Sequence, residues 1–126
     1  SGVDVRITVP HIPDKKYVYA VTKAFYSQLV KEGIKIYRYT PGFIHAKSIV
    51  SDDKYCIIGS TNMDFRSFYL HFECDLLFFD PRVCKMLYND YIDTCLQSHQ
   101  VDTKEIKGSL HSLIYRSILR IFAPLM

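Results

Sequence analysis

An imidazole, an ammonium, a carboxylate, a hydroxyl and a carboxamide occur close together in the middle of this chain. They belong to His45, Lys47, Asp52, Ser60 and Asn62. An imidazole can attack phosphorus or give a proton to a leaving alkoxide, while ammonium and amide groups can hold the phosphoryl oxygens. These residue types therefore indicate a site that binds a phosphate group and cleaves a phosphodiester.

Two apolar segments predict a β-hairpin that positions these side chains. Residues 43–50 are expected to form one strand, residues 51–54 the turn, and residues 55–58 the returning strand. On an extended strand, His45 and Lys47 point to the same face, about 7 Å apart along the chain. The hairpin therefore predicts that the imidazole and the ammonium act together.

The end of the hairpin carries the remaining polar groups. Gly59 and Ser60 follow the returning strand, which brings Asn62 back beside the first strand. Asp52 lies on the opposite strand face from His45 by parity. We therefore interpret Asp52 as a structural residue that bonds the turn or a neighbouring backbone group.

The residues before the hairpin predict a scaffold of strand, helix and strand. Apolar and polar residues alternate over 3–9, which is the period of a strand. Residues 14–31 place apolar side chains at helical spacing, and Gly33 is a suitable stop. Residues 34–39 form the next expected strand, so the unit should be parallel and right-handed.

The residues after the hairpin predict a loop, a strand and a helix. Residues 60–67 form a polar loop, and residues 69–79 alternate clearly enough to predict a strand with one face in the core. Asp80 and Pro81 are an N-cap and a first helical residue, and the helix should extend to about residue 98.

The C-terminal part predicts a last helix over 110–122, after a capping pair formed by Asp102 and Glu105. Arg116 and Arg120 lie four residues apart. Either they are solvated on a helix that packs on the sheet, or they contact anionic lipid headgroups or the other half of a larger protein. Together the elements predict an α/β fold, with a mixed β-sheet flanked by helices, in a single domain over residues 1–126.

The pattern His-x-Lys, four residues, Asp, six residues, Gly-Ser and then Asn resembles the HKD motif of the phospholipase D superfamily. The flanking residues 40–47 and 62–73 are similar to the bacterial cardiolipin synthase branch, and the resemblance extends over nearly the whole chain. Only one HKD motif is present. The resemblance therefore implies the C-terminal catalytic half of a larger two-motif enzyme whose N-terminal part carries membrane segments.

This resemblance implies a phosphatidyltransferase that makes cardiolipin from two phosphatidylglycerols through a phosphohistidine, without a metal or other cofactor. Two HKD motifs face each other in the family, and one histidine forms the covalent intermediate while the other transfers protons. His45 is one of this pair, and we expect it to be the general acid and base. Lys47 and Asn62 are expected to hold the non-bridging phosphoryl oxygens.

Three further side chains are assigned to the site. Glu73 is expected to accept a hydrogen bond from His45 and so fix its tautomer. Ser60 either contacts the substrate through its hydroxyl or orients the loop. Arg66 meets an anionic headgroup or forms a local salt bridge, and His71 and Asp75 line the rim of the cleft or are solvated strand residues.

Charge and composition limit the partners. The net charge of +3 over 126 residues is too small to indicate nucleic-acid binding by itself, so nucleic acid is an unlikely partner. We expect phosphatidylglycerol, an anionic membrane surface, and the missing HKD half or a second copy. No apolar run approaches the length of about 20 residues that spans a bilayer. The four cysteines lack metal-ligand spacing and are expected to be reduced.

The resemblance places the full-length protein at the cell membrane, with this domain on the cytoplasmic face. A second interpretation is a phospholipase D-family nuclease or phosphodiesterase in which a single-motif chain forms a homodimer. A third is a half-domain that binds phosphate or anionic lipid without turnover. We expect little activity from the isolated chain unless two copies pair through the motif face.

Overall fold

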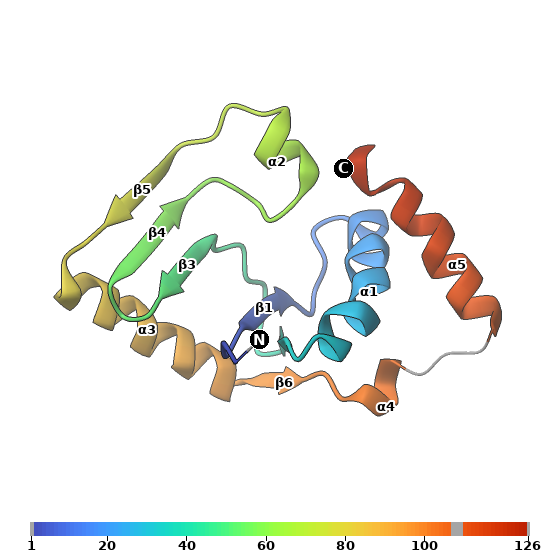
Figure 1. Ribbon diagram of the computed structural model, residues 1–126, viewed down its shortest axis with the longest axis horizontal. Helices are drawn as coiled ribbons and strands as arrows, with labels where there is room; N and C mark the ends of the chain where they lie inside the picture. The colour runs from blue at the N-terminus through green and yellow to red at the C-terminus, as the bar shows by residue number, and fades with distance from the viewer. Residues whose placement is uncertain (1, 107–109, 126) are drawn as a thin grey trace.

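The computed structural model describes residues 2–106 and 110–125. Helices and strands are both distributed along the whole of the described chain (Figure 1). In chain order the elements are β1 (Arg6–Pro10), α1 (Lys16–Lys31), β2 (Lys35–Tyr39), β3 (Ser48–Ser51), β4 (Tyr55–Gly59), α2 (Phe65–Tyr69), β5 (Asp75–Phe78), α3 (Pro81–Leu96), β6 (Ser98–Gln100), α4 (Thr103–Ile106), α5 (Leu110–Ile121) and the 3₁₀ turn η1 (Ala123–Leu125).

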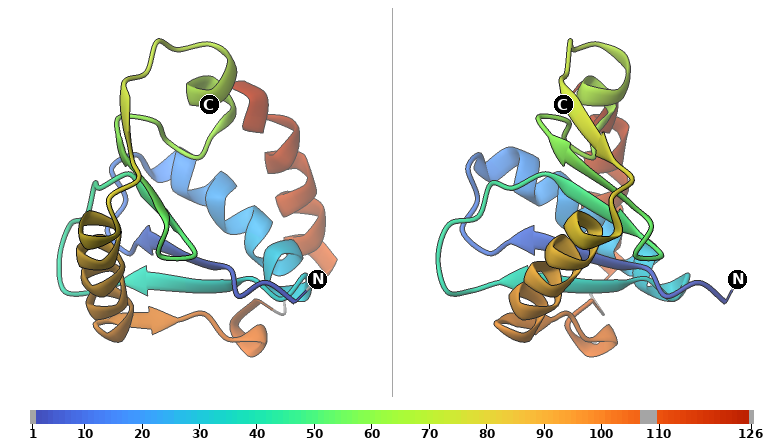
Figure 2. Two further views of the ribbon diagram at one scale, coloured as in Figure 1. Left: turned by 60° about the vertical axis from the view of Figure 1, so that its left-hand side comes forward. Right: turned by 90° about the vertical axis from the view of Figure 1, so that its left-hand side faces the viewer.

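The strands form two three-stranded sheets, with the orders β1-β2-β6 and β3-β4-β5. In the first sheet β1 and β2 are parallel, as predicted, and β6 is antiparallel to β2. The second sheet is antiparallel throughout. The α/β class with helices beside a mixed sheet is confirmed, although the strands divide between two small sheets (Figure 2).

Helix α1 ends where the sequence indicates. Gly33 has a φ of 88°, the left-handed conformation that glycine adopts without strain. The Gly33 N–H donates to the Val30 carbonyl at 3.1 Å and the Ile34 N–H donates to the Leu29 carbonyl at 3.0 Å. This pair of bonds is a Schellman motif, and it turns the chain directly into β2.

The core of the first sheet lies between α1, β2 and the residue that follows β6. Tyr26, Ile36 and Val101 are buried together, and partly buried apolar residues pack around them, namely Val9, Leu29, Val30 and Ile106. The Val101 N–H donates to the Ile36 carbonyl at 2.8 Å, which fixes β6 beside β2. The sequence did not predict β6, because its three residues are too few to show an alternating pattern.

Helix α3 connects the two sheets. Asp80 caps its first turn by accepting from the Arg82 N–H at 2.8 Å, and Pro81 occupies the first turn, as predicted. Near this end the buried Cys84 thiol lies 3.3 Å from Cys56 of β4. Near the other end Cys95 lies 3.6 Å from the Thr8 hydroxyl of β1. Helix α3 therefore contacts both the β3-β4-β5 sheet and the β1-β2-β6 sheet. All four cysteines are free thiols.

Helix α5 packs on α1. One alternative from the sequence was that this helix packs on a sheet with its arginines in solvent. That alternative is wrong. Arg120 donates to the Ala24 carbonyl of α1 at 2.6 and 3.1 Å, and Arg116 donates to the Ile106 carbonyl at 2.8 Å. Both arginines therefore face the protein, where backbone carbonyls of α4 and α1 accept hydrogen bonds from them.

The predicted strand over 69–79 is also corrected. Only Asp75–Phe78 forms a strand, and Leu76 and Phe72 are exposed rather than part of a core. The reason is that helix α2 forms within the predicted loop, and the residues after it donate backbone hydrogen bonds to the last turn of that helix. The N–H groups of Leu70 and His71 donate to the Arg66 carbonyl at 2.9 and 2.8 Å, so they cannot join a ladder.

Candidate active site

The β3–β4 hairpin positions the site, and its turn is the predicted one. Ser51 pairs with Tyr55, and the Lys54 N–H donates to the Ser51 carbonyl at 3.0 Å. Asp52 and Asp53 have φ values of 51° and 55°. Positive φ at both central positions is typical of the turns that match the twist of a hairpin, and aspartate tolerates it. Asp52 thus lies in the turn, away from the imidazole.

His45 and Lys47 contact each other just before β3. The Lys47 Nζ lies 3.0 and 3.1 Å from the two ring nitrogens of His45 and donates to its carbonyl at 3.1 Å. The Phe43 ring stacks on the imidazole, with ring centroids 5.9 Å apart. The predicted strand over 43–50 begins only at Ser48, so an irregular segment places this pair.

Gly59 brings the second part of the site beside this pair. Its N–H donates to the Lys47 carbonyl at 3.1 Å, directly across the hairpin. A Cβ atom at this position would lie 1.9 Å from the Asp75 Oδ1 atom, 2.5 Å from the Cys74 carbonyl oxygen and 2.6 Å from the Asp75 Cα atom. Glycine is therefore required here because β5 approaches the backbone of β4 too closely for any side chain.

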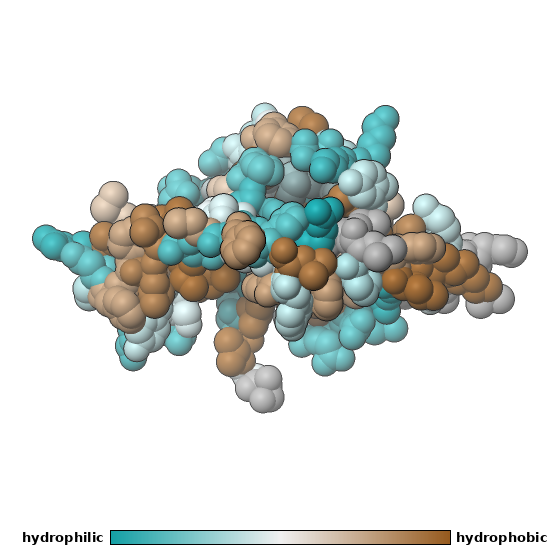
Figure 3. Space-filling model, turned by 90° about the horizontal axis from the view of Figure 1, so that it is seen from above, coloured by the Kyte–Doolittle hydropathy of each residue, from teal (hydrophilic) through white to brown (hydrophobic). Residues whose placement is uncertain are grey.

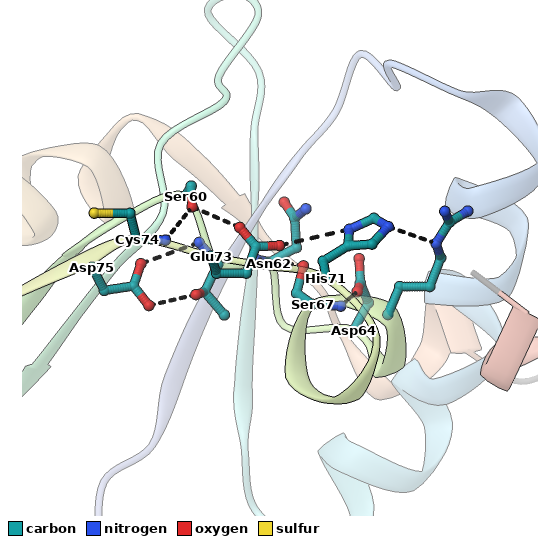
Figure 4. Close-up of polar contacts among 10 residues, drawn as sticks. Ser60, Asn62, Asp64, Ser67, His71, Glu73, Cys74 and Asp75 are labelled. Carbon is teal, nitrogen blue, oxygen red and sulfur yellow. Dashed lines mark hydrogen bonds and ion pairs between the residues drawn. The ribbon is translucent and has the colours of Figure 1, made fainter.

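Ser60 connects the end of β4 to Glu73. Its hydroxyl donates to the Glu73 carboxylate at 2.6 Å and accepts from the Cys74 N–H at 2.9 Å, while its own N–H donates to the Cys74 carbonyl at 3.1 Å. The hydroxyls of Ser60 and then Ser67 lower the pKa of Glu73, so its carboxylate form is favoured. Figure 4 shows this group together with His71.

The Glu73 carboxylate contacts Ser60 and His71. Among the described side chains, the expected hydrogen bond from His45 to Glu73 is not formed. The His71 Nδ1 atom lies 3.8 Å from the Glu73 carboxylate, and the Arg66 Nε–H donates to the His71 Nε2 atom at 3.1 Å (Figure 4). Arg66 thus has a local partner. Sequence reasoning placed His71 either on the rim or in solvent, and the structure makes it the link between Arg66 and Glu73.

Asn62 and the adjoining loop are held by α2. The Asn62 N–H donates to the Ser67 hydroxyl at 3.2 Å, and Ser67 is buried. The Ser67 N–H in turn donates to the Asp64 carboxylate at 2.8 Å, which caps the helix. This helix was not predicted from the sequence, although Asp64 is of a residue type that commonly caps a helix N-terminus.

Asp75 holds the residue between Ser60 and Asn62. Its carboxylate accepts from both the N–H and the hydroxyl of Thr61. These bonds lower the pKa of Asp75, the hydroxyl having the larger effect. Backbone from 59 to 62 is thereby fixed on three sides, by Lys47, by the start of β5 and by α2.

The motif lies on an open surface. Seen from above, polar side chains occupy the middle of the molecule and apolar side chains gather towards both ends (Figure 3). Exposed apolar residues include Leu76 and Leu77 of β5 at one end and Ile118 and Ile121 of α5 at the other. Within residues 2–106 and 110–125, two cavities of about 420 and 80 Å³ are lined by other residues than those of the motif.

In the described part of the chain, no three His, Cys, Asp or Glu side chains lie close enough together to hold a metal ion. None of the helices in that part combines the length and the apolar character that crossing a bilayer requires.

Fold and site together define an α/β domain that presents an imidazole and an ammonium side by side on an open face, next to hydroxyl and amide groups. The family model described as "Cardiolipin synthase, PLD-like domain" matches residues 1–95. The chain belongs to this phospholipase D-like family of cardiolipin synthases, as its HKD pattern predicted.

Similar proteins extend over the whole chain. An uncharacterized protein of Streptococcus mutans serotype c is 36% identical over 99% of this chain and 27% of its own length. A cardiolipin synthase of Halalkalibacterium halodurans is 33% identical over 100% of this chain and 25% of its own. A cardiolipin synthase of Clostridium perfringens is 37% identical over 100% and 27%. The chain thus spans about a quarter of these curated relatives, and no solved structure matches it.

Proposed function

We propose that this chain supplies one of the two HKD motifs of a cardiolipin synthase, which transfers a phosphatidyl group from one phosphatidylglycerol to another. The contact between His45 and Lys47 is the observation that carries this proposal. It joins a proton-transferring group to a phosphate-binding cation beside Ser60 and Asn62. Family membership supports the reaction class.

The proposed reaction has two steps. In the first, the histidine of the other motif bonds to phosphorus, the bond to the leaving glycerol oxygen breaks, and the His45 imidazolium gives that oxygen its proton. In the second, the hydroxyl oxygen of another phosphatidylglycerol bonds to phosphorus, the phosphorus–nitrogen bond breaks, and neutral His45 takes the hydroxyl proton. General acid and base catalysis of this kind is typically worth roughly 10²- to 10⁴-fold in rate.

The remaining site residues hold the phosphoryl group and the backbone around it. Lys47 binds a non-bridging oxygen as a point charge, and the Asn62 carboxamide donates to another. Glu73, bonded to Ser60, keeps the end of β4 in place and acts on His45 only indirectly. Asp52 stabilises the hairpin turn, and Arg66, which donates to His71, meets a headgroup at the edge of the site.

A second HKD motif is required, from the remainder of a longer chain or from a second copy. The open motif face and the exposed apolar residues of β5 support this requirement, because apolar side chains of this size are normally covered. In this proposal the full-length protein lies at the cell membrane, with this domain on the cytoplasmic face and phosphatidylglycerol as its substrate.

The test compares lipid transfer with nucleic-acid cleavage. Phosphatidylglycerol vesicles and single-stranded DNA are incubated with the chain in the presence of EDTA. The chain is used alone and joined to the part of the Clostridium perfringens cardiolipin synthase that lies outside the match. His45→Ala is the test variant, and His11→Ala, which changes an exposed histidine outside the motif, is the matched control.

We expect cardiolipin only from the joined protein, with loss of at least 100-fold of the rate in His45→Ala and no change in His11→Ala. Cleavage of DNA by the chain alone, abolished in His45→Ala, would show a self-pairing nuclease instead. Full transfer activity by a demonstrated monomer of this chain would refute the need for a second motif.

A further inference from the structure

A cavity of about 80 Å³ lies between α1, β2, α4 and α5. None of its lining residues belongs to the HKD motif or to the loop that carries Ser60. It is bordered by the apolar residues Val101 and Ile106, and its polar lining consists of Lys23, Tyr26, Arg38, Glu105 and Arg116.

The charges around this cavity do not balance. Three cationic side chains, Lys23, Arg38 and Arg116, face one carboxylate, that of Glu105. That carboxylate is already engaged, because it accepts from Arg38 at 2.5 Å and lies 2.6 Å from the His99 Nε2 atom. The cavity therefore keeps an excess of two positive charges.

Two buried donors on the cavity have no acceptor. Tyr26 is only 6% exposed, and within the described part of the chain neither its hydroxyl nor the buried Arg38 Nε–H has a hydrogen-bond partner. A buried donor without an acceptor is costly, and the two groups share one cavity. Burial raises the pKa of Tyr26, with a smaller effect from Tyr19, so the hydroxyl remains a donor at neutral pH.

We propose that this cavity is a second anion site, which binds a phosphate group between Lys23, Tyr26, Arg38 and Arg116. Donors and cations in excess of acceptors call for a ligand that offers several acceptor atoms and negative charge, and phosphate offers both. Its volume corresponds to about two or three water molecules, which suits one phosphate group. Any larger substituent extends through the opening.

The phosphate comes from solution or from a lipid headgroup. Beside Arg116, helix α5 turns Ile114, Ile118 and Ile121 outward, and all three are about half exposed or more. A headgroup in the cavity would have this apolar face next to it, whereas free phosphate makes no use of it. The two sources share the chemistry of the site, and the experiment separates them.

The first measurement is thermal unfolding of the chain in sodium phosphate, compared with sodium chloride at equal ionic strength. With phosphate at ten times its dissociation constant, we expect the melting temperature to rise by roughly 3 to 6 °C. Phosphate also stabilises proteins in general by exclusion from their surface, so the comparison that decides is between variants.

Tyr26→Phe is the most informative variant because it keeps the packing and removes only the unpartnered hydroxyl. Without phosphate it should unfold at the same temperature as the unchanged chain or higher. With phosphate it should gain less, corresponding to roughly two- to ten-fold weaker binding. Lys23→Gln should lose part of the gain as well. Lys31→Gln, which removes an exposed lysine from the last turn of the same helix, should keep all of it.

Vesicle sedimentation then identifies the source. Binding to phosphatidylcholine vesicles that contain phosphatidylglycerol, weakened in Tyr26→Phe and Lys23→Gln, assigns the site to a headgroup; a phosphate effect without vesicle binding assigns it to free phosphate. Equal phosphate gains in the unchanged chain, Tyr26→Phe and Lys23→Gln would overturn the proposal. So would a loss of stability in Tyr26→Phe that is the same in both salts, since the hydroxyl would then bind water alone. None of these outcomes depends on phosphatidyl transfer.

Discussion

Replacing Gly59 by alanine tests the reasoning about the end of β4. The added methyl group would lie 2.5 Å from the Cys74 carbonyl oxygen and 2.6 Å from the Asp75 Cα atom, in addition to its clash with the Asp75 side chain. A flexible carboxylate can move aside at little cost. The two backbone atoms cannot, so β5 must separate from β4 at this point.

The cost follows from what that separation breaks. Overpacking by itself destabilises a protein by about 1–3 kcal/mol. Separation also breaks the two bonds between Ser60 and the Cys74 backbone, each worth about 0.5–1.5 kcal/mol. We therefore expect Gly59→Ala to lower the free energy of unfolding by about 2–6 kcal/mol, measured by urea denaturation followed by circular dichroism.

Gly42→Ala is the matched control. A Cβ at Gly42 meets nothing within 4 Å, and its backbone is outside the positive-φ region. Its free energy of unfolding should change by less than about 1 kcal/mol, with a gain expected from the less flexible unfolded chain. Equal urea midpoints for the two alanine variants would refute the argument that β5 excludes a side chain at position 59.

Three further predictions concern single side chains. Ser60→Ala should raise the pKa of Glu73 in an NMR titration. Because the pKa of Glu73 is lowered in the folded protein, its bond to Ser60 stabilises the fold above the unfolded-state pKa, and this stabilisation is lost as the pH falls through the folded-state pKa. A loss of stability in Ser60→Ala that persisted at acid pH would contradict this assignment. Asp80→Ala should cost about 1 kcal/mol in thermal unfolding, and no loss would mean that the cap contributes nothing. A thiol reagent at pH 8 should modify exposed Cys74 first and Cys84 slowly, since burial raises the pKa of the Cys84 thiol to about 11; equal rates in the folded protein would contradict the burial.

Local signals in the sequence predicted the elements that depend on them. Gly33 ends α1 through its own backbone conformation, and Asp80 begins α3 through its own carboxylate. The hairpin also followed from short-range features, namely two apolar segments and the aspartates at its turn. The sequence placed His45 and Lys47 on one face because they are two positions apart, whereas their direct contact comes from the irregular segment before β3.

Features that depend on distant neighbours were not predictable in this way. Glu73 was expected on His45, yet it bonds Ser60, because the pairing of β5 with β4 decides which group it reaches. Apolar and polar residues alternate over 69–74 as in a strand, but backbone N–H groups in this segment donate to a carbonyl of α2. Helix α5 turns its arginines inward because carbonyl groups of α1 and α4 accept from them, and one helix's sequence cannot show the carbonyls of another.

The turn at Asp52 and Asp53 restricts changes in length within the motif. Lys47 faces Gly59 because the strand register is centred on Asp53, and each of the two residues lies six positions from it. A residue inserted into β3 alone would shift His45 and Lys47 past their partners and turn them to the other face. Only matched insertions in both strands would keep the site together. The spacing that identifies the family is thus a rule of strand register, and it would limit insertions and deletions here even if every catalytic side chain were kept.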